Sequence, residues 1–194
     1  MDCTLIKSLL LLFSLLFFAL LFVVYKLKKR LKEYNENKNV LIRNAYFNPV
    51  TDLPNRLNIE LVIGEQIDRC LRHNNSFLIA IVKVLNYYDV KAHSQELADE
   101  FMREASNRVL QSVRDEDIVG HITDDGFAIV FNEYLEEENF HIVLERLENA
   151  FKEAPQIDTK YQLHYEVSIG VGKFPDHGTD TMLLLDKATK EALK

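Results

Sequence analysis

Apolar residues fill the start of the chain without interruption. Residues 5–25 read LIKSLLLLFSLLFFALLFVVY, and from Ser8 to Tyr25 the run has no charge and no proline. This length is at the threshold at which a helix spans a bilayer. Basic side chains follow directly, at Lys26, Lys28, Lys29, Arg30 and Lys32. The pattern predicts a single-pass transmembrane anchor over residues 1–25, with the C-terminal part of the chain in the cytoplasm.

Two other interpretations of this run fit it less well. In a cleaved signal peptide the basic residues precede the apolar core and a small-residue site closes it, and neither feature is present here. A buried core helix normally has a polar face, which this segment of leucine and phenylalanine lacks.

Residues 26–47 are predicted to form a basic juxtamembrane helix or linker. Leu27, Leu31, Tyr34 and Leu41 lie near one helical stripe, which is typical of a short coiled-coil stalk and would support a homodimer. The stripe covers barely two heptads, so a polar linker remains the alternative.

Helix-type and strand-type periodicities alternate through the rest of the chain, residues 48–194. Helix patterns begin near Pro54, with apolar Ile63, Ile67, Cys70 and Leu71, and recur at 97–109, 140–151 and 180–193. Strand patterns occur at 77–85, in a hairpin over 117–132, and at 161–171. The order β-α-β-β-α-β with a helix in front predicts an α+β, ferredoxin-like fold: an antiparallel-rich sheet with flanking helices.

Charge is divided unevenly between these parts. Residues 26–43 carry seven basic and two acidic side chains, and residues 44–194 carry fifteen basic and twenty-seven acidic ones. The basic segment suits anionic lipid headgroups, whereas the acidic domain would repel nucleic acid, which we exclude as a partner. Cys3 and Cys70 stand far apart and predict neither a disulfide nor a zinc site.

Residues 120–131, GHITDDGFAIVF, place an Asp-Gly pair between two strand-like runs, which is a strong hairpin signal. The tip, TDDGF, resembles the signature of the GGDEF family of bacterial diguanylate cyclases. NPVTDLPNR at 48–56 resembles that family's DPLTGLPNR opening, and YEVSIGVGKFPDHG at 165–178 resembles its VTVSIGIAxYPxHG segment. The resemblance implies the palm-like nucleotidyl-cyclase sheet and, because the family is bacterial, an anchor in the inner membrane.

Active members of the family join two GTP molecules across a homodimer with the help of two divalent metal ions. By resemblance, carboxylates from the end of the first strand and from the hairpin hold these ions. The two signature glycines let the backbone approach the nucleotide.

This chain departs from that pattern at most of the catalytic positions. Lys83 stands at the first-strand metal position, Thr123 and Asp124 replace the signature glycines, and Gly126 replaces the glutamate. Asp125 keeps the third signature position and is the one residual metal-ligand candidate. We hypothesise that Lys83 pairs with Asp125 across the metal position, although an aspartate is also favoured in an Asp-Gly turn for backbone reasons.

Other family positions are altered as well. The next first-strand aspartate falls at Leu85, the guanine-binding segment reads Tyr87–Ala92, and the phosphate-holding lysine falls at Leu193. Asp99, with a one-residue gap, matches the guanine-contacting aspartate of the second helix.

The inhibitory RxxD site of the family, which binds the product cyclic di-GMP, has matching residues at Arg114 and Asp117. With one inserted residue, Arg146 matches the second arginine on the following helix. Guanidinium groups bind phosphate oxygens and guanine edges in a bidentate manner. The alternatives are that Asp117 only ends a helix-to-strand connection and that both arginines are ordinary surface charges.

Three functions therefore stay open: a membrane-anchored, catalytically degenerate receptor for cyclic di-GMP, a GGDEF-fold module that binds a protein partner, and a residual diguanylate cyclase. We expect no cofactor for the first two. Mg²⁺ is expected only if cyclase activity persists.

Overall fold

The computed structural model describes residues 3–131, 137–157 and 160–193. The chain divides into two compact units, residues 1–45 and residues 46–194, each of which is described by itself.

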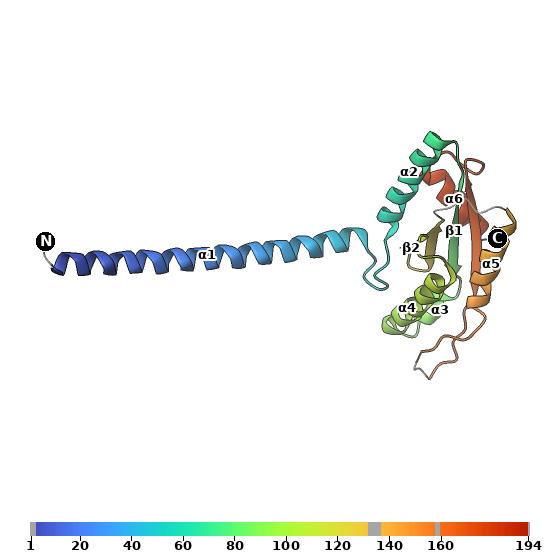
Figure 1. The fold of residues 1–194 in the computed structure, drawn as a ribbon. Coiled ribbons are helices and arrows are strands. Elements are labelled where there is room, and N and C mark those ends of the chain that lie inside the picture. The colour runs from blue at the N-terminus through green and yellow to red at the C-terminus, as the bar shows by residue number, and fades with distance from the viewer. Residues whose placement is uncertain (1–2, 132–136, 158–159, 194) are drawn as a thin grey trace. The chain divides into compact units, whose positions relative to one another are not determined.

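The first unit is one continuous helix, α1, which runs over Cys3–Tyr46 and includes Tyr46, the first residue of the second unit (Figure 1). Among the residues that the structure describes, no helix combines the length and the apolarity needed to cross a membrane. The side chains of residues 3–15, 18 and 19 are not described, so most of the predicted anchor lies outside the residues on which this finding rests. Residues 26–46 are helical throughout, which does not distinguish a coiled-coil stalk from a polar linker.

The second unit contains a four-stranded sheet. Its elements, in chain order, are α2 (Arg56–His73), β1 (Phe77–Val84), α3 (Tyr87–Lys91), α4 (Gln95–Ser112), β2 (Ile118–Thr123), β3 (Gly126–Val130), α5 (Glu137–Ala150), β4 (Val167–Phe174) and α6 (Thr181–Glu191). The strand order is β2-β3-β1-β4, and every neighbouring pair is antiparallel. This arrangement confirms the predicted α+β, ferredoxin-like layout.

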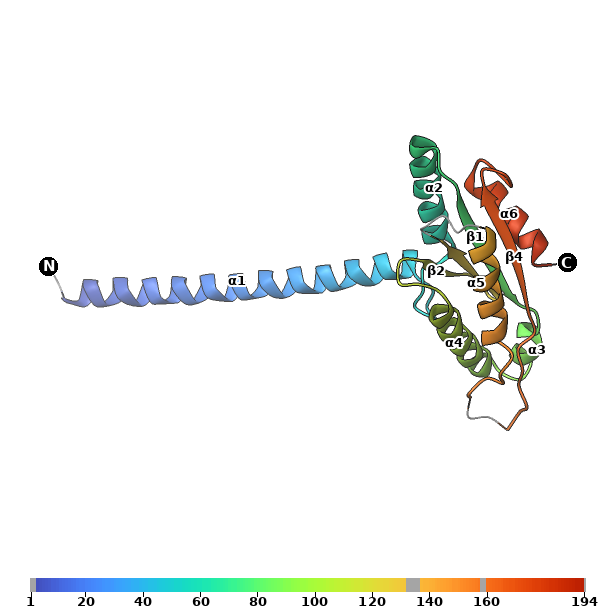
Figure 2. The same ribbon diagram turned by 45° about the vertical axis from the view of Figure 1, so that its right-hand side comes forward.

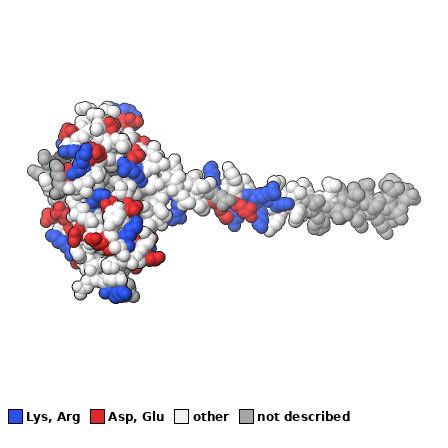
Figure 3. Space-filling model, turned by 180° about the vertical axis from the view of Figure 1, so that it is seen from behind, with Lys and Arg blue, Asp and Glu red and all other residues white. Residues whose placement is uncertain are grey.

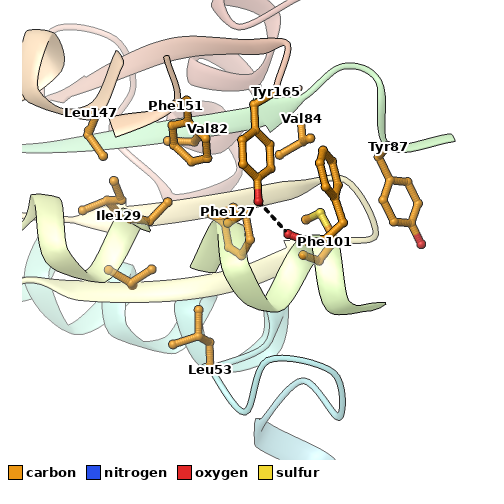
Figure 4. Close-up of a cluster of buried hydrophobic side chains, with 14 of the residues drawn as sticks. Leu53, Val82, Val84, Tyr87, Phe101, Phe127, Ile129, Leu147, Phe151 and Tyr165 are labelled. Carbon is orange, nitrogen blue, oxygen red and sulfur yellow. Dashed lines mark hydrogen bonds between the residues drawn. The ribbon is translucent and has the colours of Figure 1, made fainter. Parts of the chain in front are cut away.

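Helices cover both faces of the sheet, as Figures 1 and 2 show from two sides. Alternate residues of β1 point to opposite faces, and both faces are apolar because the strand is central. Ile79 and Ile81 pack in the core beneath α2 and α6. Val82 and Val84 pack in the core beneath α4 and α5, part of which is drawn in Figure 4.

Side chains at the helix starts explain where α2, α4 and α6 begin. Asn55, Ser94 and Asp180 stand at the N-cap positions, and each side-chain oxygen accepts a hydrogen bond from a backbone N–H of the first turn. Such caps satisfy donors that have no partner inside the helix. The helix predicted near Pro54 therefore starts at Arg56.

The structure corrects three details of the sequence prediction. Leu71 and Leu85 are more than half exposed and do not join the core. The strand predicted over 161–171 starts instead at Val167, because its partner β1 ends at Val84, which pairs with Val167. Tyr165 precedes the strand, and its ring packs against Phe101 of α4 instead of against a neighbouring strand.

Candidate functional site

The hairpin of β2 and β3 brings Thr123, Asp125 and Gly126 against the end of β1. Gly126 is the cross-strand neighbour of both Thr123 on β2 and Lys83 on β1. On the other side of β1, Lys83 is paired with Ser168 of β4. Cross-strand neighbours share one face of a sheet, so Lys83 and Thr123 flank the bare backbone of Gly126.

Lys83 and Asp125 form an ion pair at this point. The Lys83 ammonium lies 2.7 Å from one carboxylate oxygen of Asp125 and 2.8 Å from the other. The Thr123 hydroxyl donates a further hydrogen bond of 2.8 Å to the first oxygen. Side-chain exposure is only 13% for Lys83 and 18% for Asp125. The hypothesised pair is therefore confirmed, and it is mostly shielded from water.

The electrostatics of Asp125 follow from these contacts. Burial, the largest single effect, raises the pKa of the Asp125 carboxyl. Hydrogen bonds from Lys83 and Thr123, with the charge of Lys83, outweigh burial and hold the pKa below its ordinary value. Asp125 is consequently a carboxylate over the physiological pH range.

Gly126 is needed for this arrangement. A Cβ atom added there would lie 2.7 Å from the Thr123 hydroxyl oxygen and 3.1 Å from Cδ of Lys83. Any larger residue would push at least one of the two side chains away. Gly126 thus makes room for the lysine on β1 and for the threonine on β2.

These residues do not fit a divalent metal ion. A hard cation such as Mg²⁺ needs oxygen ligands in octahedral geometry, and Lys83 places an ammonium against both oxygens of the retained carboxylate. Within residues 3–131, 137–157 and 160–193, no group of three His, Cys, Asp or Glu side chains could hold a metal ion.

Asp124 points to a different place from Asp125. Its carboxylate lies 3.5 Å from the Lys91 ammonium of α3. The two residues border a small polar pocket of about 150 Å³, which Asp99 and His121 also line. Asp99 accepts a hydrogen bond of 2.7 Å from the Gln95 amide. The structure thus brings Asp99, for which the resemblance predicted a guanine contact, to the same pocket as Asp124.

His121 connects the hairpin to the segment before α2. Its Nε2 lies 3.3 Å from the Asp124 carbonyl oxygen, and its Nδ1 lies 3.1 Å from the Thr51 hydroxyl. A carbonyl only accepts, so Nε2 donates and Nδ1 accepts from Thr51 in the neutral ring. Burial is the main reason why the pKa of His121 lies below its ordinary value.

A partly buried polar network joins α4 to Tyr165, on the face of the sheet that α4 and α5 cover. The Tyr165 hydroxyl lies within hydrogen-bond distance of the Glu104 carboxylate and, at 3.1 Å, of the Phe101 carbonyl oxygen (Figure 4). Burial, and then the neighbouring Glu104 carboxylate, raise the pKa of Tyr165. Arg108 pairs with Glu104 at 2.7 Å and its guanidinium lies 4.9 Å from the centre of the Tyr165 ring.

Arg108 also closes the C-terminal end of α5. Its guanidinium donates hydrogen bonds of 2.7–2.9 Å to the carbonyl oxygens of Ala150, Glu153 and Ala154. The last carbonyls of a helix have no partner within the helix. Arg108 therefore fixes α5 against α4.

The three residues predicted for cyclic di-GMP occupy two neighbouring places. Asp117 accepts a hydrogen bond of 3.0 Å from the backbone N–H of Arg114, so it shapes the turn after α4. The Arg114 guanidinium lies 3.6 Å from the Glu116 carboxylate and is half exposed. Arg146 lines a groove of about 640 Å³ between α4 and α5, whose lining includes Ser112 but neither Arg114 nor Asp117.

Sequence reasoning missed His121 and the network around Arg108. Val119 and Phe127 are buried on the same face as His121, so strand alternation would have predicted a buried histidine. Glu104 and Arg108 are spaced i, i+4 on one helix face, which indicates an ion pair. The hydrogen bond between Glu104 and Tyr165 joins residues 61 positions apart, and no local sequence pattern could have predicted it.

Similarity to known proteins extends over most of the chain. The family model described as "Diguanylate cyclase, GGDEF domain" matches residues 45–194. The bifunctional diguanylate cyclase/cyclic di-GMP phosphodiesterase MucR of Pseudomonas aeruginosa is 24% identical over 139 residues, which are 71% of this chain and 20% of MucR. The chain spans about a fifth of the length of the curated relatives it matches.

Two solved structures show the same fold. The coiled coil and GGDEF domain of DgcB from Caulobacter crescentus, in complex with c-di-GMP, has a TM-score of 0.73 at 11% identity and covers 86% of this chain and 88% of that one. Diguanylate cyclase SiaD of Pseudomonas aeruginosa, in complex with its activator SiaC, has a TM-score of 0.69 at 19% identity. The match covers 98% of this chain and 74% of the SiaD chain. Relatives of this fold thus bind cyclic di-GMP and a partner protein. With the hairpin, the four-stranded sheet and the match over residues 45–194 together, the chain belongs to the GGDEF-domain family.

Proposed function

We propose that this chain is a membrane-anchored GGDEF-domain protein that lacks diguanylate cyclase activity and acts as a receptor for cyclic di-GMP. The observation that carries the loss of activity is the ion pair of Lys83 and Asp125. An ammonium takes the place at which the family binds a divalent ion.

Charge decides whether catalysis survives. Metal ions in such sites stabilise the transferring phosphoryl group by several kcal/mol. Lys83 removes one carboxylate and adds a cation, and Asp125 is already neutralised by that cation. The side chains of Thr123 and Asp124 also stand where the family has glycines for close approach of the nucleotide. The polar pocket beside Asp124, at about 150 Å³, is small for a nucleoside triphosphate.

The groove between α4 and α5 supports the receptor part of the proposal. Arg146 borders it together with four amide side chains, which are Asn107, Gln111, Asn149 and Gln156. Guanidinium and amide groups together recognise phosphate oxygens and guanine edges. Ser112, two residues before Arg114, lines the same groove, so a ligand there would come near the RxxD residues. DgcB, which shares the fold, was solved with c-di-GMP.

The location follows from the N-terminal sequence. The apolar run over residues 5–25 is proposed to anchor the protein in the bacterial inner membrane, with the basic segment at the cytoplasmic surface. The exposed cations of α1 are visible in Figure 3. The acidic domain would then lie in the cytoplasm as part of a homodimer.

Isothermal titration of the 44–194 fragment with cyclic di-GMP tests the receptor. This fragment corresponds to the second compact unit, which has its own core. We expect binding that weakens about 10- to 100-fold in Arg146→Ala, the range for loss of a charged hydrogen bond. Arg103→Ala, at an exposed position outside the groove, should leave binding unchanged. An absence of heat at several hundred micromolar ligand would exclude the receptor and favour the protein-interaction module.

Incubation of the fragment with GTP and magnesium or manganese tests the loss of activity separately. We expect no cyclic di-GMP above the level of a Lys83→Ala control. Product formation by the unmodified protein above that control would overturn the non-catalytic proposal.

A further inference from the structure

β4 forms one edge of the sheet, since it stands last in the strand order β2-β3-β1-β4. The N–H of Leu85, directly after β1, donates to the Glu166 carbonyl oxygen at 2.7 Å. Backbone groups alternate in direction along an antiparallel strand, so the even-numbered residues of β4 bond to β1. The N–H and C=O groups of the odd-numbered residues, from Val167 to Lys173, therefore point away from the sheet. We call these outward groups the β4 edge.

Side chains cover the β4 edge towards its C-terminal end. The Glu191 carboxylate of α6 accepts a hydrogen bond of 3.1 Å from the N–H of Val171. His177 covers the next position, because its Nδ1 accepts from the N–H of Lys173 at 3.2 Å and its own N–H donates to the Lys173 carbonyl oxygen at 2.8 Å. Proteins commonly cover edge groups in this way to prevent pairing with other chains.

The N-terminal part of the β4 edge has no such cover. Among the residues that the structure describes, none bonds to the outward N–H and C=O groups of Val167 and Ile169. The side chains of these two residues are β-branched and pack, partly buried, on the face of the sheet that α4 and α5 cover. A hollow of about 550 Å³ borders Val167, and Phe151 and Leu85 line it as well. The open groups thus lie beside space for an apolar side chain.

We propose that an extended, basic peptide segment of a partner protein adds to the β4 edge as a fifth strand over Val167–Val171. In this mode of recognition main-chain hydrogen bonds supply the affinity, and alternate side chains supply the specificity. The residues of the added strand that continue the row of Val167 and Ile169 would be apolar. One of them would enter the hollow beside Phe151. The proposal does not depend on the binding of cyclic di-GMP.

Carboxylates at both ends of this stretch favour basic residues at the remaining positions of the peptide. Glu191 stands at Val171, and Glu166 directly precedes β4 with a side chain that is 56% exposed. Residues 44–194 carry fifteen basic and twenty-seven acidic side chains, so the domain as a whole also attracts a cationic segment. A lysine of the peptide that pairs with Glu191 would release the N–H of Val171 for the added strand.

A second folded copy fits the β4 edge less well than a peptide does. α6 lies directly over β4, since a Cβ atom on Gly170 would collide with the Ala188 carbonyl oxygen and one on Gly172 would stand 2.9 Å from that of Leu184 (Figure 2). Paired strands are about 4.8 Å apart, whereas packed helices need about 8–10 Å. An antiparallel pair of β4 strands would therefore force two α6 helices into each other.

Titration of the 44–194 fragment with a synthetic peptide, followed by nuclear magnetic resonance, tests the proposal. The probe is the heptapeptide acetyl-Lys-Val-Lys-Val-Lys-Val-Lys-amide. Its control carries a methyl group on the backbone nitrogen of each valine, which keeps the charge and the side chains but removes the donors of an added strand. We expect the probe to shift the amide signals of residues 167–171 and to bind at least tenfold more tightly than the control. Equal affinities, or no binding at millimolar peptide, would overturn the proposal.

Two variants at one position separate backbone pairing from side-chain contact. Ile169→Pro removes an outward N–H that bonds to no other strand, and edge strands accept proline at such positions. Ile169→Val keeps that N–H. We expect the proline variant to bind the probe at least tenfold more weakly and the valine variant to bind it unchanged, and equal affinities would refute strand addition. A fragment that dimerises without peptide, and loses the dimer in Ile169→Pro, would identify a second copy as the occupant and contradict the peptide. The methylated peptide decides the question alone if the proline variant does not fold.

Discussion

The Lys83 ammonium touches both oxygens of the Asp125 carboxylate, at 2.7 and 2.8 Å, and so ties β1 to the tip of the β2–β3 hairpin. The backbone strengthens this link, because the N–H of Val84 donates to the Asp125 carbonyl oxygen at 2.7 Å. The Thr123 hydroxyl donates a further hydrogen bond to Asp125, and Gly126, which has no side chain, leaves space for Lys83 and Thr123. These four residues therefore act as a set, and changing one should disturb the rest.

Replacing Lys83 by methionine should destabilise the 44–194 fragment by about 1–3 kcal/mol, because it leaves a shielded carboxylate without its counter-ion. No cyclase activity should appear. Urea unfolding gives the free energy. The matched control is Lys173→Met, which removes an exposed pair with Asp176 and should cost less than about 1 kcal/mol. Equal losses in the two variants would mean that the Lys83 pair is energetically an ordinary surface pair.

Gly126→Glu should also destabilise the fragment, because its Cβ would stand 2.7 Å from the Thr123 hydroxyl oxygen. Crowding of this kind typically costs about 1–3 kcal/mol. Adding Thr123→Gly should recover part of the loss. As a control, Gly64→Ala on α2 meets its nearest atom at 3.9 Å and should be neutral or stabilising. Thermal unfolding of the four proteins compares these effects, and unchanged stability in Gly126→Glu would contradict the argument.

Acidification should weaken the fold through His121. Its pKa in the folded state lies below the ordinary 6.5, so below pH 6.5 the unfolded chain binds a proton that the folded chain does not. The contribution of His121 to the free energy of unfolding is therefore complete above pH 6.5, and it is lost as the pH drops towards the folded-state pKa. The total loss is about 1.4 kcal/mol for each unit by which the folded-state pKa lies below the unfolded-state pKa. Urea midpoints at pH 7.5 and 5.5 should differ more for the unmodified fragment than for His121→Gln.

Exposed His141 provides the control for that experiment. His141→Gln should keep the pH dependence of the unmodified fragment. If His121→Gln kept it too, the acid sensitivity would belong to other groups. Protonation of Asp125 should lower the free energy of unfolding further at more acidic pH. Its folded-state pKa lies below the ordinary 3.8, so this loss begins below pH 3.8.

Arg108→Lys should loosen the end of α5. A lysine keeps the charge beside Glu104 but cannot reproduce a planar guanidinium that donates to three carbonyl oxygens. We expect a loss of about 1–3 kcal/mol in unfolding free energy and faster amide exchange in the last turn of α5. Arg103→Lys, on the exposed side of the same helix, should change neither quantity. Unchanged exchange in Arg108→Lys would remove the proposed link between α4 and α5.

Local periodicity was enough to predict most of the elements. The nearly continuous apolar run at 77–85 indicated a strand buried on both faces, and β1 is an inner strand of the sheet with helices on both faces. The hairpin that the Asp-Gly pair predicted is present, but its turn residues are Asp124 and Asp125, and Gly126 is the first residue of β3. The pattern at 161–171 misled, since alternation reports which side chains are apolar and not whether a neighbouring strand is there to pair with.

The sequence by itself determined the family and the order of the main strands and helices, because these depend on residue identity and spacing along the chain. Only the tertiary structure showed that Lys83 forms an ion pair with Asp125 and that Gly126 provides the space between Thr123 and Lys83. It also separated Arg146 in the α4–α5 groove from the Arg114–Asp117 turn. Such relations join residues that are distant in sequence, and they arise only when strand register and helix packing bring the side chains within a few ångströms.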